Sequence, residues 1–156
     1  MRALPFTLAM LFMCATVGFA LTPSAYAQNV IITGMDDYNF GTHVAGSGTK
    51  QQTQAFCVGK SAGNKNWNGT INGSGAGGAF TITDGAGNTI PFTVRRLPNP
   101  TYTAGVSNSA NQADNNAPLD CNGTDNQDLR IEMTGANLDG VPAGTYTGYI
   151  DVTVSP

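Results

Sequence analysis

The chain has 156 residues, of which 40% are hydrophobic and only 11% are charged, with a net charge of −3. This length suits one domain with a core large enough to fold, and hardly two. With 7 basic against 10 acidic residues, the chain lacks the cationic surface that binds nucleic acid or docks on anionic lipid, so both partners are disfavoured.

The first 27 residues have the pattern of a secretory signal peptide. Arg2 precedes an apolar run that ends in the small-x-small sequence Ala25-Tyr26-Ala27. Thr16, Gly18, Thr22 and Pro23 interrupt the run, whereas a membrane anchor needs about 20 unbroken apolar residues. We therefore predict a signal peptide at 1–27 and one mature domain at 28–156, with no direct membrane span.

After the leader, the sequence predicts strands and no long helix. No window repeats apolar residues at helical spacing, and Gly, Asn, Thr and Ser are spread throughout. Short alternating runs recur between Gly- and Asn-rich turns. The predicted strands are 29–35, 39–44, 53–58, 67–73, 79–83, 89–95, 127–134 and 145–155. This pattern predicts an all-β sandwich or barrel.

The turns between these runs add detail. Asp84-Gly85 and Gly87-Asn88 accept positive φ, which predicts a hairpin over 80–94. The stretch 75–78 lacks the ending of a phosphate loop, so it is interpreted as a connector. Residues 98–127 are interpreted as a long surface loop with one short strand near 102–106. The alternation in 127–134 and 145–155 predicts two half-buried strands that form the closing hairpin of a sandwich.

Two cysteines, Cys57 and Cys121, remain after the leader is removed. An even pair in an exported protein most often forms a disulfide. A zinc site would need about four ligands, and a catalytic thiol would need a histidine partner and protection from oxidation. We predict a Cys57–Cys121 disulfide, with no metal and no cofactor.

No catalytic group is evident in the sequence. Asp36 and Asp37 cannot form the carboxylate pair of a glycosidase, because neighbours in a strand face opposite sides. They are interpreted as turn residues. His43, the single histidine, has no nucleophile or positioned acid nearby in the sequence and is interpreted as a strand-end residue. The acidic residues of the long loop do not have the spacing of a calcium-binding loop. These are Asp114, Asp120, Asp125 and Asp128.

Aromatic and basic side chains offer weaker signals. Trp67, Tyr102 and Tyr146 could stack on sugar rings, but a sandwich core and its ends also use aromatic residues, and the second interpretation is favoured. Arg95-Arg96 is interpreted as one inward-neighbouring and one solvent-facing strand residue rather than an anion clamp.

The pattern resembles the secreted pilin family that includes spore coat protein U-like domains, exported by the chaperone/usher pathway. The DYNFG opening, the two cysteines and the PAGTYTG ending are its most specific parts. The matching stretches are ITGMDDYNFGT (32–42), FCVGKSAG (56–63), INGSGAGGAFTITDG (71–85), TIPFTV (89–94), LDCNG (119–123) and LDGVPAGTYTGYIDVTVSP (138–156). The resemblance covers most of the mature chain.

The resemblance implies an immunoglobulin-like β-sandwich of about seven to eight strands that lacks one strand and is completed by a donor strand from the next subunit. It implies a non-enzymatic structural subunit of a surface fimbria, with adhesion or biofilm roles. Its partners would be other pilin subunits, a periplasmic chaperone and an outer-membrane usher, and its location the periplasm in transit and then the cell surface. The alternative is a self-contained secreted binding module, such as a lectin-like adhesin.

Val30 and Ile32 are the candidate donor residues, because they alternate on one face of the N-terminal run QNVIITG. The same run is short enough to be the first strand of its own domain, which leaves self-complementation open. Tyr38 and Phe40 are expected to point inward, and Gly41 is expected to relieve the backbone beside them.

Overall fold

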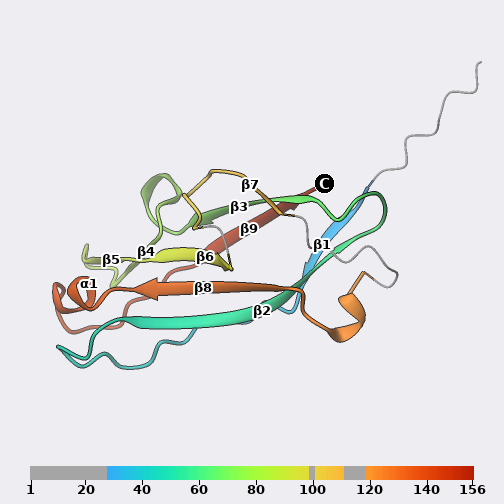
Figure 1. Ribbon diagram of the computed structural model, residues 1–156. Helices are drawn as coiled ribbons and strands as arrows, with labels where there is room; N and C mark the ends of the chain where they lie inside the picture. The colour runs from blue at the N-terminus through green and yellow to red at the C-terminus, as the bar shows by residue number, and fades with distance from the viewer. Residues whose placement is uncertain (1–27, 99–100, 111–118) are drawn as a thin grey trace, which may run out of the picture.

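The computed structural model describes residues 28–98, 101–110 and 119–156, and these form strands with very little helix (Figure 1). The strands are β1 (Val30–Thr33), β2 (Lys50–Lys60), β3 (Trp67–Gly73), β4 (Thr81–Thr83), β5 (Thr89–Pro91), β6 (Thr93–Leu97), β7 (Asn108–Ala110), β8 (Gln127–Met133) and β9 (Ile150–Ser155). The helical turns are η1 (Ala76–Gly78), η2 (Cys121–Gly123) and α1 (Gly135–Asp139). The all-β prediction is confirmed.

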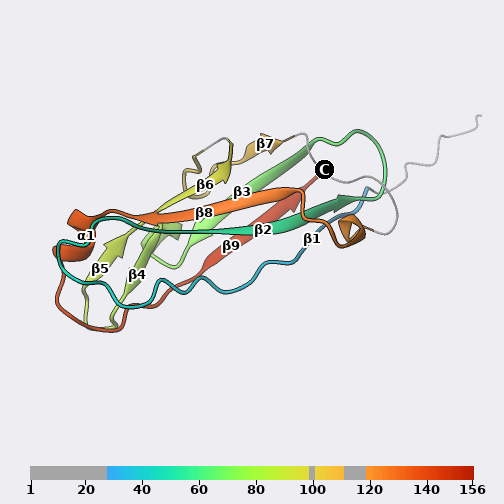
Figure 2. The ribbon, with the colours of Figure 1, turned by 60° about the horizontal axis from the view of Figure 1, so that its bottom comes forward.

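The strands form an antiparallel sandwich. One sheet has the order β1-β2-β8-β6, a second has the order β7-β3-β9, and β4 pairs with β5 in a small third sheet. Figures 1 and 2 show β2 and β8 side by side in one layer of an elongated molecule and β3 and β9 in the other. This arrangement is consistent with an immunoglobulin-like sandwich.

The core lies between the two main sheets, and alternation in the central strands explains it. In β3 and β8 every second residue is buried, so each strand contributes one apolar row to the interior. The largest fully buried side chains come from both layers: Trp67, Phe56, Ile71, Leu129, Val58 and Val94. Phe80 and Phe92 stack with ring centroids 5.6 Å apart at the β4–β5 end of the molecule.

The hairpin predicted over 80–94 is present as the β4–β5 pair, with Thr83 opposite Thr89. Its turn is organised by Asp84, whose carboxylate accepts hydrogen bonds from Ala86 N (2.8 Å), Asn88 N (3.1 Å) and Asn88 Nδ2 (2.6 Å). The Asn88 side-chain amide, followed by the backbone donors, lowers the pKa of Asp84. The ionised carboxylate of Asp84 therefore stabilises the turn of the hairpin.

Two predicted strands differ from the structure. The prediction of a strand over 39–44 is wrong, because side chains of β2 bind the backbone there in place of a partner strand, as described below. The run 89–95 is divided at Phe92, whose N–H bonds to Phe80 O at 2.9 Å. From Thr93 onward the chain pairs with β8 instead, so it changes sheets at this point.

The predicted closing hairpin is also wrong. β8 lies between β2 and β6, whereas β9 pairs with β3 in the other sheet. After Met133 the chain enters α1, which is capped by Thr134 Oγ1 accepting from Asn137 N at 3.3 Å, and then crosses between layers. Alternation correctly indicated which faces point inward, but it carries no information about which strand is the partner.

Other predictions concern the loop and the leader. The strand expected near 102–106 is found later, as β7, and the run 145–155 becomes a strand only from Ile150. Residues 99–100 and 111–118 of the predicted loop lie outside the described residues, as does the predicted signal peptide. Within the described part, no helix is long and apolar enough to cross a membrane.

Candidate functional site

Two of the edge strands, β1 and β9, carry apolar side chains that the core covers only in part. We call this set the half-buried strip. Its members are Val30, Ile32, Met35, Tyr38 and Phe40 in and after β1, and Ile150, Val152 and Val154 in β9. All of them pack against the buried core, and each remains half-exposed.

The half-buried strip contrasts with the central strands. The inward residues of β3 and β8 are buried, whereas the inward residues of β1 and β9 are not. Among the named strands of the described residues, β1 pairs only with β2, and β9 pairs only with β3. Each strand therefore has one unpaired edge beside a row of incompletely covered apolar side chains, which is the arrangement that accepts an added strand.

Side chains of β2 hold the segment that follows β1. Gln54 accepts from Asp36 N at 3.0 Å and donates to Asp37 O at 2.7 Å, which imitates a backbone pair with one amide group. Gln52 accepts from Asn39 N at 2.9 Å. The Lys50 ammonium donates to Thr42 O at 2.7 Å. Because these contacts come from side chains, 36–42 lies along the sandwich without joining a sheet.

Tyr38 and Phe40 are directed toward the core, as expected, although no strand carries them. Their rings stack with centroids 6.3 Å apart. The Tyr38 hydroxyl donates to Leu129 O at 2.8 Å, and burial raises the pKa of Tyr38 to about 12, so the phenol remains protonated as a donor at ordinary pH. Gly41 has φ 61°, which fits its expected role next to them.

Cys57 and Cys121 form the predicted disulfide, across a sequence separation of 64 residues. It joins β2 to η2, and the same contact is secured by Asn126, which accepts from Val58 N at 3.0 Å and donates to Val58 O at 3.1 Å. A Cβ on Gly59 would overlap the backbone of Leu119, so the close approach of this loop to β2 requires glycine.

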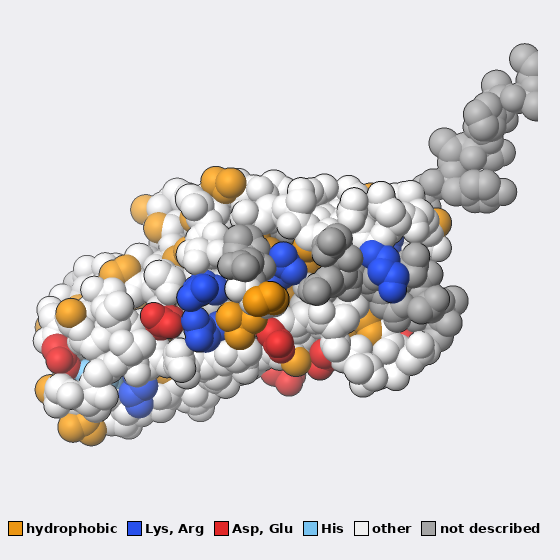
Figure 3. Space-filling view, viewed as in Figure 1, with side chains coloured by type: hydrophobic (Ala, Val, Ile, Leu, Met, Phe, Trp, Pro, Cys, Tyr) orange, Lys and Arg blue, Asp and Glu red, His pale blue; other side chains and the backbone are white. Residues whose placement is uncertain are grey.

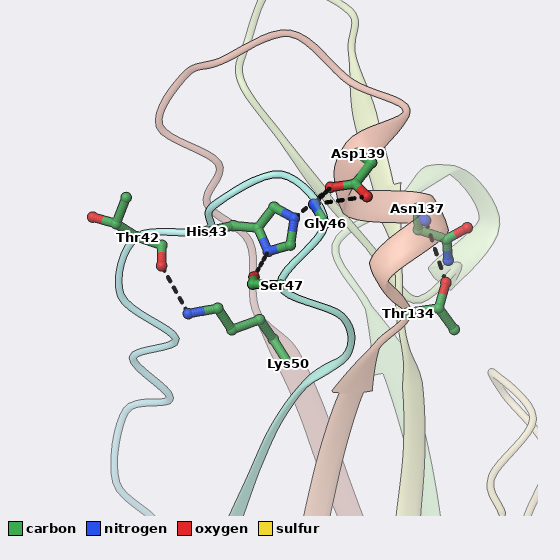
Figure 4. A network of polar contacts seen from close by, with 8 residues as sticks. All are labelled: Thr42, His43, Gly46, Ser47, Lys50, Thr134, Asn137 and Asp139. Carbon is green, nitrogen blue, oxygen red and sulfur yellow. Dashed lines mark hydrogen bonds and ion pairs between the residues drawn. The ribbon is translucent and has the colours of Figure 1, made fainter.

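A second polar arrangement lies at the opposite end of the sandwich (Figure 4). His43 Nε2 lies 2.7 Å from Asp139 Oδ1 at the end of α1, and Ser47 Oγ lies 3.2 Å from His43 Nδ1. Gly46 N donates to both Asp139 oxygens at 3.2 Å. The order serine, histidine, aspartate is that of a hydrolase triad. Asp139 is 96 residues from His43, so no local pattern indicates this pairing.

The geometry of this network fits a structural clamp. The Gly46 N–H, which could otherwise stabilise an oxyanion, is already bonded to Asp139. Ser47 belongs to the same exposed turn, where its N–H bonds to Val44 O at 2.9 Å. The network therefore fastens the loop before β2 to α1. The prediction of His43 as a strand-end residue is wrong, because His43 lies in this loop and not in a strand.

The clamp predicts that the stability of the folded protein depends on pH in the acidic range. The hydrogen bond from His43, and then that from Gly46, lowers the pKa of Asp139 below its usual value of 3.8. A depressed pKa in the folded state contributes stability above 3.8 that is lost as the pH falls through the folded value. Asp139→Asn should therefore show a smaller fall in thermal midpoint between pH 5 and pH 2 than the wild type.

The control for this prediction is Asp151→Asn, which removes an exposed carboxylate on β9. Its fall in thermal midpoint on acidification should match that of the wild type. An equal acid dependence in Asp139→Asn and the wild type would show that the clamp contributes nothing to pH sensitivity.

The remaining sequence candidates fall into three places. Val30 and Ile32 lie in β1, where Val30 is opposite Lys60 and Ile32 is opposite Val58 of the same chain. Trp67 and Tyr102 are core residues, whereas Tyr146 is half-buried. This agrees with their interpretation as core and rim.

The two arginines of the tandem differ in depth. Arg96 is 8% exposed and lies over the Trp67 ring, while Arg95 is half-exposed opposite Arg130. Of the loop acids, Asp120 caps η2 by accepting from Asn122 N at 3.0 Å. Asp114 lies outside the described residues.

Comparisons with known proteins show a shared fold. No family model matches the sequence, and no curated protein matches it. Among solved structures, a chain of a chaperone–tip adhesin complex of CFA/I fimbriae matches with a TM-score of 0.62 and 19% identity, over 82% of this chain and 41% of that one. A chain of the CsuC–CsuE chaperone–tip subunit pre-assembly complex of archaic chaperone-usher Csu pili from Acinetobacter baumannii matches with a TM-score of 0.49 and 18% identity, over 82% of this chain and 39% of that one.

The present chain thus spans about two fifths of the solved chains that it matches. At this identity, the likeness to the chain of the CFA/I complex is a likeness of fold alone.

Proposed function

We propose that the chain is a non-enzymatic structural subunit of a surface pilus, assembled by addition of a strand along the half-buried strip. The observation that carries the proposal is the pair of unpaired edges, on β1 and β9, beside apolar side chains that the core leaves half-exposed. The fold shared with a chain of a fimbrial chaperone–tip adhesin complex supports it.

Strand addition gives affinity in two ways. The main chain of the incoming strand bonds to the free N–H and C=O groups of β9, and its alternate side chains cover Ile150, Val152 and Val154. Completing the burial of one such side chain contributes about 1 kcal/mol. The affinity of the added strand therefore depends on these side chains and the main-chain hydrogen bonds together.

The same surface accounts for the proposed partners. A subunit with an uncovered apolar edge aggregates unless it is covered during transit. We therefore assign a periplasmic chaperone to the half-buried strip before assembly and another subunit to it afterwards, with export through an outer-membrane usher. The location follows as the periplasm and then the cell surface, where the fibre would contribute to adhesion.

Val30 and Ile32 remain our candidates for the donated strand. In the single chain they pair with β2, so donation requires β1 to leave β2 and bind a neighbouring subunit. β1 has four residues, whereas β2 has 11. Few hydrogen bonds must therefore break for β1 to leave β2.

Val152→Asp should prevent fibre formation, because it places a carboxylate in the middle of the half-buried strip, where an incoming strand would have to bury it. The measurement is electron microscopy of surface fibres in cells that lack the native gene and carry the variant. Thr153→Asp is the matched control: it adds the same charge at the next position of β9, on the exposed face, and should restore fibres.

Retention of the Cys57–Cys121 disulfide in both variants, checked by mass after thiol alkylation, separates an assembly defect from misfolding. Normal fibres with Val152→Asp would contradict strand addition at this edge.

One observation favours the alternative function, a self-contained secreted binding module. β1 is already paired within its own chain, which is what a domain without exchange requires. A purified chain that stays monomeric at high concentration, without a chaperone, would support this alternative.

A further inference from the structure

A polar cavity of about 850 Å³ lies near the end of the sandwich where β2 meets β3. Lys60 and Arg96 line it, together with Asn64, Asn66, Asn68 and Ser109. A volume of this size is in the range of sites that hold small organic ligands. No side chain among the described lining residues is acidic, although the chain as a whole is. Pro156, the last residue of the sequence, also lines the cavity, and its main-chain oxygen accepts from Asn68 Nδ2 at 3.2 Å. Ser109 Oγ donates to Asn68 Oδ1 at 2.8 Å.

Both cations of the cavity are buried and have neutral partners. Lys60 is 2% exposed, and its Nζ donates to Asn66 O at 2.6 Å and Asn64 Oδ1 at 3.5 Å. Arg96 is 8% exposed, and its Nη1 donates to Gln127 Oε1 at 3.2 Å. Among the described residues, neither forms a salt bridge. Buried charges are costly unless an opposite charge offsets them.

Arg96 also has an unused donor. Its guanidinium carbon lies 5.8 Å from the centroid of the Trp67 ring, which fixes the plane of the group. Its Nε is buried and has no hydrogen-bond partner within the described part of the chain. Trp67 Nε1 and the Nε atoms of Arg95 and Arg130 are also without a partner there, but of these four residues Arg96 is the one that lines the cavity. Since buried donors are nearly always bonded in folded proteins, a ligand in the cavity is placed to supply the acceptor for Arg96.

Figure 3 shows basic side chains over β6 and β8 and near the end of the molecule where β2 finishes, with an acidic side chain beside the first group. Arg130 of β8 lies 3.9 Å from Glu132. Carboxylates therefore offset part of the positive charge on this face, whereas Lys60 and Arg96 have no such partner among the described residues.

We propose that this cavity binds a sugar acid, with the carboxylate of the ligand between Lys60 and Arg96 and its hydroxyls on the Asn64, Asn68 and Ser109 side chains. Amides and hydroxyls both donate and accept, as sugar hydroxyls do, and a carboxylate satisfies an arginine and a lysine together. A small inorganic anion would leave most of the 850 Å³ empty. The assignment concerns the single subunit and does not depend on pilus assembly.

The test is isothermal titration calorimetry of the purified protein with D-glucuronate, D-glucose, acetate and sulfate. Glucuronate should bind with a Kd of about 1 mM or tighter. Glucose lacks the carboxylate and acetate lacks the ring, so each should bind at least about tenfold more weakly. No binding of glucuronate, or equal binding of glucose, would overturn the proposal, and sulfate or acetate binding as tightly as glucuronate would overturn the sugar-acid assignment.

Variants locate the site. Lys60→Gln removes one cation of the cavity and should weaken glucuronate binding at least about tenfold. Lys65→Gln makes the same change of charge on the exposed loop next to the cavity and outside its lining, and should leave binding within about twofold of wild type.

Asn68→Asp is a second test that leaves Lys60 and its bonds to the loop in place. It puts a negative charge in the cavity and should also weaken binding at least about tenfold. Thermal midpoints report whether each variant is folded. Wild-type affinity in a folded Lys60→Gln or a folded Asn68→Asp would place the ligand elsewhere.

Discussion

Replacement of both cysteines, Cys57→Ala with Cys121→Ala, is expected to lower the free energy of unfolding by about 4 kcal/mol. The disulfide closes a loop with a sequence separation of 64 residues, and the chain-entropy model gives about that value for such a loop. Domains of this size have about 5–15 kcal/mol in total, so the variant should be partly unfolded at 37 °C.

The measurement is urea unfolding followed by the fluorescence of Trp67, which is the single tryptophan and is 2% exposed. Wild-type protein treated with a reductant is the matched comparison, since it loses the same bond without a change of sequence, and it should unfold at the same urea concentration as the variant. A loss below about 1 kcal/mol would mean that Asn126 and the close packing at Gly59 hold the loop without the disulfide.

The second large effect concerns the donor strand. A copy of residues 28–35 joined after Pro156 by a Gly/Ser linker is expected to raise the thermal midpoint by about 10 °C or more. The copy would lie along β9 and complete the burial of the half-buried strip. Three or four side chains at about 1 kcal/mol each correspond to a shift of this order in a small domain.

The control for this design changes the copy alone. Asp in place of both Val30 and Ile32 within the appended segment leaves the native β1, and its pairing with β2, untouched. This variant should melt at the temperature of the unextended protein, as measured by circular dichroism. Stabilisation by both copies would exclude Val30 and Ile32 as donor residues, and stabilisation by neither would mean that this segment does not fit the strip.

Much of the sandwich could be predicted from local pattern. The strand over 67–73, most of β8 and the hairpin at Asp84 were recognisable because alternation and turn residues act over a few positions. The disulfide followed from the presence of two cysteines in a chain predicted to be exported. The strands and the hairpin depend on neighbours in sequence, and two cysteines allow a single intramolecular pairing.

The features that could not be predicted depend on distant residues. Nothing near His43 in the sequence indicates that Asp139 lies against it. Nothing in the stretch 51–54 (QQTQ) indicates that Gln52 and Gln54 bind the backbone of 36–39. The partial exposure of Ile150 and Val152 depends on the position of β9 at the edge of its sheet, which an alternating sequence does not reveal. Lys60 and Arg96 share a cavity only because β2 and β6 end close to one another.

The position of β8 has a consequence for the order of events in the life of the chain. Residues 50–56 have their main hydrogen-bonding partner at 127–133, so more than half of the polypeptide must leave the ribosome before this central pair can form. Until then residues 50–56 of β2 have no partner strand, since β1 pairs with 57–60. Unpaired strand edges favour aggregation, so this segment needs protection while the chain is still being made.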